Sequence, residues 1–126
     1  MYTTAQQAYD AVGKATDSNR KLEAAALFKI ARQMEIYRDA GKDPMRGEFL
    51  TGALLSNLRL WTLFQSELAQ EDNELPSDLR VDLLKLSAFV DRRTFEVMAE
   101  PAPEKIQSLI DINRHIASGL AAAQEN

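Results

Sequence analysis

The stretch Asn57–Asn73, NLRLWTLFQSELAQEDN, decides the fold of this chain. Within it, Trp61, Phe64 and Leu68 recur at steps of three and four residues, a spacing that places their side chains on one face of an α-helix. The same alternating steps continue upstream, and the complete stripe comprises Leu50, Leu54, Asn57, Trp61, Phe64 and Leu68. Such a stripe is typical of helices that pack side by side in a bundle. We therefore predict a long amphipathic helix that ends at an acidic turn containing Asn73.

Further apolar stripes with helical spacing flank this segment, and glycine and proline fall between them, where helix boundaries are expected. Ser18 is a candidate N-cap, Gly41 a candidate C-terminal stop, and Asp43-Pro44 and Pro76 are candidate helix starts. The predicted helices cover residues 4–15, 18–40, 43–69, 76–99 and 103–123. No period-two alternation indicates a strand. We predict an all-α fold in one domain spanning 1–126, an up-and-down bundle of four main helices plus a short N-terminal helix.

Composition limits the classes of function. The chain has 126 residues, of which 45% are hydrophobic and 27% charged, as expected for one folded domain. Its formal net charge of -4 argues against direct nucleic-acid binding, which needs clustered lysine and arginine. No apolar run approaches the roughly 20 residues that span a bilayer, and no secretion signal precedes the first helix. With no cysteine available for disulfides, we expect a cytoplasmic protein.

The sequence lacks the residues of a catalytic or metal site. His115 is the only histidine and falls on the polar face of the 103–123 helix, so neither a catalytic triad nor a histidine pair for a metal is available within one chain. Gly13-Lys14 lacks the loop of a phosphate-binding motif, and no calcium-loop spacing occurs. We expect no enzymatic activity, no cofactor and no metal.

Two predicted helices have more apolar surface than one face can hold. The 76–99 helix carries a main stripe, and Val81, Leu84, Ala88 and Phe95 lie on its opposite side. The main stripe comprises Leu79, Leu83, Leu86, Val90 and Val97. Leu55 and Leu63 similarly lie behind the stripe of the 43–69 helix. Either the N-terminal or the second helix covers the second face of 76–99 and makes that helix the most buried one, or an amphipathic helix of a partner docks there.

The second reading gives a set of candidate partner-binding residues. They are Tyr9, Leu55, Leu63, Val81, Leu84, Ala88 and Phe95. Tyr9 belongs to the short N-terminal helix, which is marginal alone, so a stronger helical ligand can displace it.

Polar residues interrupt two of the stripes. Asn57 and Asn113 occupy core positions of the 43–69 and 103–123 helices, where an amide needs partners or costs roughly 1 to 3 kcal/mol. They indicate a hydrogen-bonded device that fixes helix register, with contact to a partner backbone as the alternative. Trp61 lies in the middle of its stripe and is predicted to be a core residue rather than a binding hot spot.

The ordered set of motifs resembles the FlaF family of bacterial flagellar biosynthesis regulators from about Ala5 to Leu120. The set consists of the opening stretch, then Leu75-Pro76, then LRVDLLKLSAFV and VMAEPAPEKIQSLIDINRHIASGL. The family motif falls on Asn57, Trp61, Phe64, Asn73, Pro76 and Asn113, which we interpret as structural.

The resemblance implies a small cytoplasmic factor required for flagellin to accumulate, be exported and assemble into the filament. It implies a chaperone and regulator that binds the amphipathic terminal helices of flagellin, with the translational regulator FlbT or the export machinery as further candidate partners. The alternative is a post-transcriptional regulator of flagellin expression that acts through RNA or another regulator, such as FlbT, without holding flagellin. A purely structural adaptor is a third reading.

Overall fold

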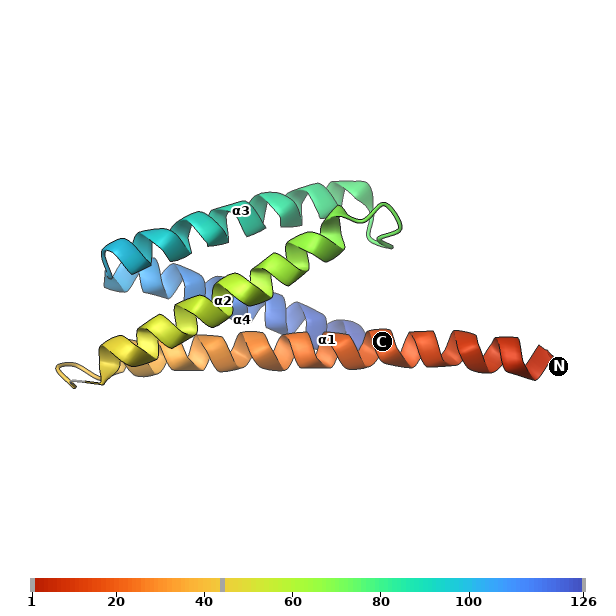
Figure 1. Cartoon of the computed structure of the whole chain (residues 1–126), viewed down its shortest axis with the longest axis horizontal. Helices are drawn as coiled ribbons and strands as arrows, with labels where there is room; N and C mark the ends of the chain where they lie inside the picture. The colour runs from red at the N-terminus through yellow and green to blue at the C-terminus, as the bar shows by residue number, and fades with distance from the viewer. Residues whose placement is uncertain (1, 44, 126) are drawn as a thin grey trace.

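The computed structural model describes the backbone over residues 2–43 and 45–125, and the side chains over 20–43 and 45–122. It contains four helices, α1 (Tyr2–Asp39), α2 (Arg46–Ala69), α3 (Ser77–Ala99) and α4 (Pro103–Glu125), and the described ranges contain no strand (Figure 1). The predicted all-α bundle of four main helices is therefore confirmed.

The helices form two closely packed pairs joined by α2. α1 packs mainly on α4 and also on α2, whereas α3 packs mainly on α2 and less extensively on α4. In Figure 1, α2 starts beside α1 and crosses the bundle, so that its C-terminal end lies beside α3. Over the described residues α1 does not pack on α3, and the two pairs diverge at the end formed by the α2–α3 turn.

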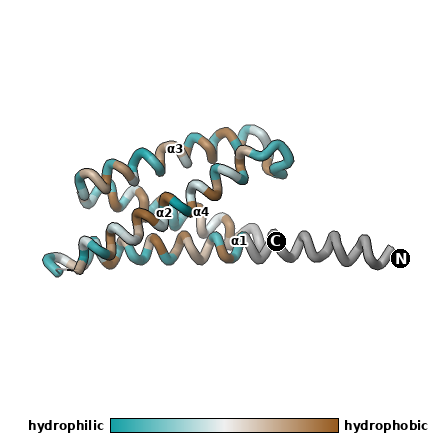
Figure 2. Tube along the Cα trace, viewed as in Figure 1, coloured by the Kyte–Doolittle hydropathy of each residue, from teal (hydrophilic) through white to brown (hydrophobic). Residues whose placement is uncertain are grey.

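One apolar core fills the space between the helices. All six residues of the predicted α2 stripe are buried, and α1 contributes Leu27, Ile30, Ala31 and Met34, which recur at helical spacing. α4 contributes Ile106, Leu109, Ile110 and Ala117 to the same core. Figure 2 shows the apolar and hydrophilic residues alternating along each helix, which is the pattern that predicted a bundle.

The N-terminal boundaries differ from the prediction. Residues 4–15 and 18–40 do not form two helices, because α1 is continuous from Tyr2 to Asp39. Ser18 therefore lies inside a helix rather than at an N-cap. Between the two predicted segments the sequence has no proline, and a single glycine costs a helix interior only about 1 kcal/mol, so nothing forces a break there.

The α1–α2 connection is a glycine stop followed by an Asx turn. Gly41 has a φ of 61°, as predicted for the left-handed residue after a helix. α2 begins at Arg46, three residues later than the predicted 43, and the Asp43 carboxylate accepts a hydrogen bond from the Met45 N–H at 2.9 Å in the turn before it. Pro44 lies outside the described residues.

The core face of α3 also differs from its predicted stripe. Val90 and Val97 are buried as expected, but Leu79 is 44% exposed and Leu83 and Leu86 are only half-buried. Ser87 and Thr94 take the buried positions instead. The physical reason is the absence of α1 from this side, since only α2 and α4 cover α3. The expectation that α1 buries the second face of α3, making it the most buried helix, is therefore wrong for the described residues.

Candidate functional site

A chain of buried hydrogen bonds fixes the register of α2, α3 and α4. The Asn113 amide donates to Oδ1 of Asn57 at 2.7 Å, and the Trp61 indole N–H donates to Oδ1 of Asn113 at 3.0 Å. Asn57 Nδ2 donates to the Thr94 hydroxyl at 3.4 Å, and that hydroxyl donates to the Val90 carbonyl at 2.6 Å. The two asparagines are fully buried, so the predicted hydrogen-bonded amides are present in the core. Trp61 is 1% exposed and serves as a core residue.

The turn between α2 and α3 is held by two side chains. Asn73 donates to the Glu67 carbonyl and accepts from the Leu75 N–H, which closes the turn locally. Arg80 donates to the carbonyls of Leu68 and Gln70, which the end of α2 leaves without helical partners. Pro76 precedes the first residue of α3 and starts the helix one residue later than predicted. This turn orients α3 against α2.

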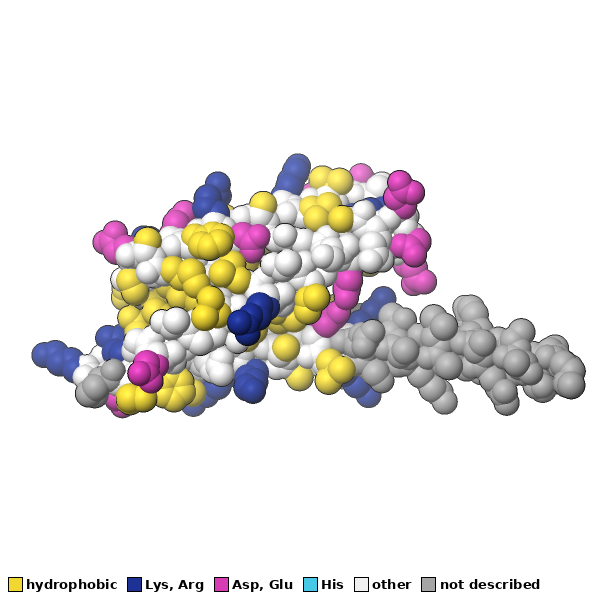
Figure 3. Space-filling view, viewed as in Figure 1, with side chains coloured by type: hydrophobic (Ala, Val, Ile, Leu, Met, Phe, Trp, Pro, Cys, Tyr) yellow, Lys and Arg dark blue, Asp and Glu magenta, His cyan; other side chains and the backbone are white. Residues whose placement is uncertain are grey.

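Most predicted partner-binding residues lie on one outward side of α3 or on the neighbouring part of α2. Val81, Ala88, Phe95 and Leu55 are exposed and Leu84 is partly exposed; we call these five residues the outer face. Asn57 lies opposite Thr94, so antiparallel packing places Leu55 near the level of Phe95. Figure 3 shows apolar side chains gathered between the N-terminal half of α2 and the C-terminal half of α3. Phe95 is 59% exposed, the highest exposed fraction among the large apolar side chains of the outer face.

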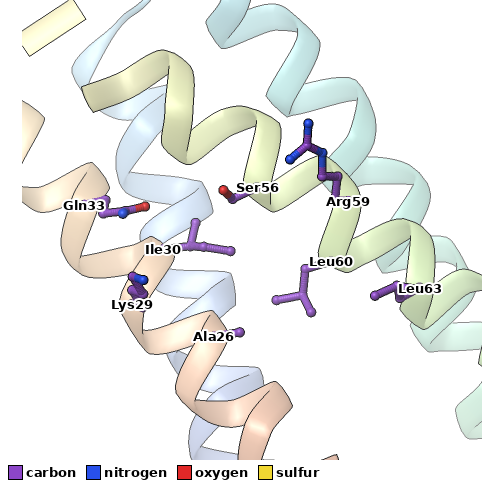
Figure 4. A pocket seen from close by; sticks show the side chains of 8 residues that line it. All are labelled: Ala26, Lys29, Ile30, Gln33, Ser56, Arg59, Leu60 and Leu63. Carbon is purple, nitrogen blue, oxygen red and sulfur yellow. The ribbon is translucent and has the colours of Figure 1, made fainter. Parts of the chain in front are cut away.

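Leu63 belongs to a different surface. It lines a shallow groove of about 340 Å³ between α1 and α2, together with Ala26, Ile30 and Leu60 (Figure 4). Lys29, Gln33, Ser56 and Arg59 form the polar part of the groove lining. At about 100° per residue, Leu63 projects on the α1 side of α2 and Leu55 on the α3 side. The structure therefore separates these two predicted residues. Tyr9, the remaining one, lies outside the described side chains.

A larger cleft of about 660 Å³ opens at the end of the bundle where the helix pairs diverge. Its walls come from all four helices and from the α2–α3 turn. The apolar lining includes Leu68 of α2, Leu79 and Leu83 of α3, and Ile116 and Leu120 of α4. This cleft was not predicted from the sequence, because the stripe that contains Leu79 and Leu83 was assigned to the core. The sequence signal for the cleft was the apolar stripe of α3 itself. In the structure, the described part of α1 does not pack on α3 and so does not cover the first half of that stripe.

The rim of the cleft carries several carboxylates. Glu23 of α1 and Glu67 of α2 line it, as do Asp72 and Glu74 of the turn. Figure 3 shows acidic side chains around this end of the molecule. Arg20 and His115 are the basic and imidazole groups in the lining, and the His115 ring lies 2.8 Å from the Asp111 carbonyl through Nδ1. Carboxylates outnumber cations at the rim.

Glu23 is the titratable group most affected by this environment. Burial and the nearby charge of Glu67 raise the pKa of Glu23 from 4.5 to about 7, against a smaller opposing effect of Arg20. The Glu23 carboxyl therefore changes its protonation near neutral pH.

α1 and α4 are joined by an ion pair away from the cleft. Arg114 of α4 forms a salt bridge and a hydrogen bond with the largely buried carboxylate of Glu35. Burial acts to raise the pKa of Glu35, but the hydrogen bond and charge of Arg114, assisted by Arg32, outweigh it and the pKa lies below its usual value. This pair links α1 to α4.

The described residues contain no group of three or more histidine, cysteine, aspartate or glutamate side chains arranged to hold a metal ion. Within the same ranges, no helix is sufficiently long and apolar to cross a bilayer.

Comparison with protein families gives one match. Residues 5–120 match the model of the family described as "Flagellar protein FlaF", which is nearly the whole chain. No curated protein and no solved structure matches the chain.

Proposed function

Because this chain belongs to the FlaF family of flagellar proteins, we propose that it is a cytoplasmic, non-catalytic chaperone and regulator that binds flagellin. In this proposal it holds the amphipathic terminal helices of newly made flagellin and supports flagellin synthesis, export and filament assembly. It then passes flagellin to the export machinery, and FlbT is a further candidate partner.

The exposed outer face carries the proposal. Val81, Leu84 and Ala88 follow the i, i+3, i+7 pattern with which one helix anchors another, and Phe95 extends the same stripe by two turns. An apolar surface of this kind on a single soluble domain marks a site of association. A flagellin terminal helix has a complementary apolar stripe, and docking it here would remove both surfaces from water.

The competing function is post-transcriptional regulation through RNA. That mode requires a basic surface and gives an affinity that falls steeply with salt. The net charge of -4 and the acidic end of the molecule oppose it. In our proposal, this protein affects flagellin expression according to whether it has flagellin bound. Such an effect does not require the protein to bind RNA.

The test is co-expression with the flagellin of the same organism, followed by purification of a soluble complex. The wild-type chain is expected to give a stoichiometric complex, which is lost when flagellin lacks its terminal helices. The double variant Leu84→Asp/Phe95→Asp is expected to keep the helix content and stability of the wild-type chain, because neither residue is buried, but to capture much less flagellin.

Leu22→Asp/Met45→Asp is the matched control, since Leu22 is 68% and Met45 52% exposed and both lie off the outer face. It adds the same charge and is expected to retain flagellin. Failure of the wild-type chain to form any complex would refute the proposal. Equal capture by the two double variants would show that the outer face is not the binding surface.

A further inference from the structure

The cleft at the divergent end of the bundle is lined by apolar side chains from several helices. Leu79 and Leu83 belong to the first half of the predicted α3 core stripe, yet Leu79 is 44% exposed, Leu83 is only half-buried, and both line this cleft. Ile116 and Leu120 of α4 line the same space from another helix. Because each of these side chains lies on a helix face, a further helix placed between them would continue the packing of the bundle. The cleft volume of about 660 Å³ is sufficient for several large apolar side chains.

The negative charge at the rim of the cleft favours some helices over others. Glu23 and Glu67 approach each other across the rim from α1 and α2, with only Arg20 close enough to oppose the effect on Glu23. Asp72 and Glu74 add further negative charge from the turn. A helix with a carboxylate near this rim would be repelled, whereas an ammonium or guanidinium group would form charge-assisted hydrogen bonds with both carboxylates.

We propose that this cleft binds an amphipathic flagellin helix that carries a lysine or arginine at the edge of its apolar stripe, with Glu23 and Glu67 pairing with that cation. The inference rests on the proposed function for the identity of the client, and it adds a second surface, distinct from the outer face, with its own selectivity. Glu23 and Glu67 act as specificity-determining residues, and Leu79, Leu83, Ile116 and Leu120 form the apolar seat.

Binding of a cation to this site should depend on pH, because Glu23 exchanges a proton with solvent. Near neutral pH the Glu23 carboxyl holds a proton for part of the time. An arriving cation favours the ionised carboxylate, so that the proton is released to solvent as the ion pair forms. Affinity for flagellin must then rise as pH increases. The charged and titratable groups that line the cleft with Glu23 are Arg20 on its own helix, Glu67 on α2, Asp72 and Glu74 on the turn, and His115 on α4. Replacing Glu23 and Glu67 together by neutral residues separates their contribution to the pH dependence of binding from that of the other groups.

The first experiment measures flagellin affinity at pH 6 and pH 8 by fluorescence anisotropy with labelled monomeric flagellin. For the wild-type chain we expect up to about tenfold tighter binding at pH 8, because a group of pKa about 7 passes from mostly protonated to mostly ionised over that range. Glu23→Gln/Glu67→Gln is expected to bind more weakly at pH 8 and to show less than about twofold pH dependence. Glu48→Gln/Glu104→Gln removes the same charge from exposed positions outside the cleft and should behave as wild type.

The second experiment fills the cleft without disturbing the core. Gly119 lies on α4 in the cleft lining, and a Cβ added there meets no atom within 4 Å. Gly119→Leu should therefore stabilise α4, as replacing a helical glycine usually does, while occupying the space that the client needs. Gly119→Ala is the control, since it gives the helix benefit with little obstruction. We expect flagellin affinity to fall at least about tenfold in Gly119→Leu and to change little in Gly119→Ala.

Each outcome has a defined meaning. If flagellin binds but neither the glutamine pair nor Gly119→Leu alters affinity or pH dependence, the cleft is not a client site and this inference is wrong, whereas the proposed function stands. If the wild-type chain binds no flagellin at any pH, both are refuted.

Discussion

The buried amide network makes a quantitative prediction for Asn113→Ala. This substitution removes the acceptor of the Trp61 indole N–H and the donor to Asn57 Oδ1, the two shortest side-chain contacts of the network between helices. Both remaining partners are fully or almost fully buried, so solvent cannot replace what is lost. Each polar group left without a partner costs about 1 to 3 kcal/mol, and the cavity left by the amide adds about 1 kcal/mol. We expect a loss of about 3 to 7 kcal/mol, a large share of the stability of a domain of this size.

Urea unfolding followed by far-ultraviolet circular dichroism measures this loss as a change in the free energy of unfolding. A double-mutant cycle with Trp61→Phe isolates the indole contribution, because phenylalanine has no N–H to leave unsatisfied. In the Trp61→Phe background, Asn113→Ala should cost about 1 to 2 kcal/mol less than in the wild-type chain. A loss below about 1 kcal/mol for the single variant, or additive losses in the cycle, would refute the network as the device that fixes helix register.

Three further predictions concern stability. The folded pKa of Glu23, about 7, lies above its ordinary value of 4.5, so the native state binds more protons between these values and wild-type stability should fall as pH rises from about 5 to 8; Glu23→Gln should remove about 1 to 2 kcal/mol of that fall in urea titrations at each pH. The pKa of Glu35 is depressed, so its ion pair with Arg114 stabilises the protein above the unfolded pKa and is lost on acidification; Glu35→Gln should lower the midpoint of thermal unfolding at pH 7 and reduce the difference between pH 7 and pH 3. Arg80→Met removes the donor of the Leu68 carbonyl and one of the two donors of the Gln70 carbonyl, and should cost about 1 to 3 kcal/mol and speed amide hydrogen exchange at the end of α2.

The spacing of apolar residues predicted the parts of the fold in which a helix has a single apolar face and neighbouring helices enclose it. The α2 stripe from Leu50 to Leu68 is buried throughout, because α2 contacts both α1 and α3 and its core face is enclosed. Asn57 and Asn113 were identifiable for the same reason, since a polar residue in an enclosed stripe must find a partner. The stop at Gly41 followed from the backbone freedom of glycine.

The sequence did not predict the neighbours of α3. Val81 and Leu79 lie on different faces of one helix, and their spacing alone does not say which face is covered. Which face of α3 is covered depends on the path of α2 across the bundle. This path leaves α1 out of contact with α3 and opens the cleft beside Leu79. The approach of Glu23 to Glu67 depends on the same crossing and involves residues 44 positions apart, a separation with no local pattern. The outer face was identified as surplus apolar surface, but the separation of Leu63 from Leu55 required the structure.

The most direct test of the central claim is calorimetric titration of the purified chain with monomeric flagellin at several temperatures. Binding through apolar surface that the bundle leaves uncovered predicts saturable one-to-one association with a negative heat capacity change. Leu84→Asp/Phe95→Asp should weaken that association clearly, whereas Leu22→Asp/Met45→Asp should preserve it. No saturable heat with the wild-type chain, or the same binding by the outer-face variant, would contradict the account.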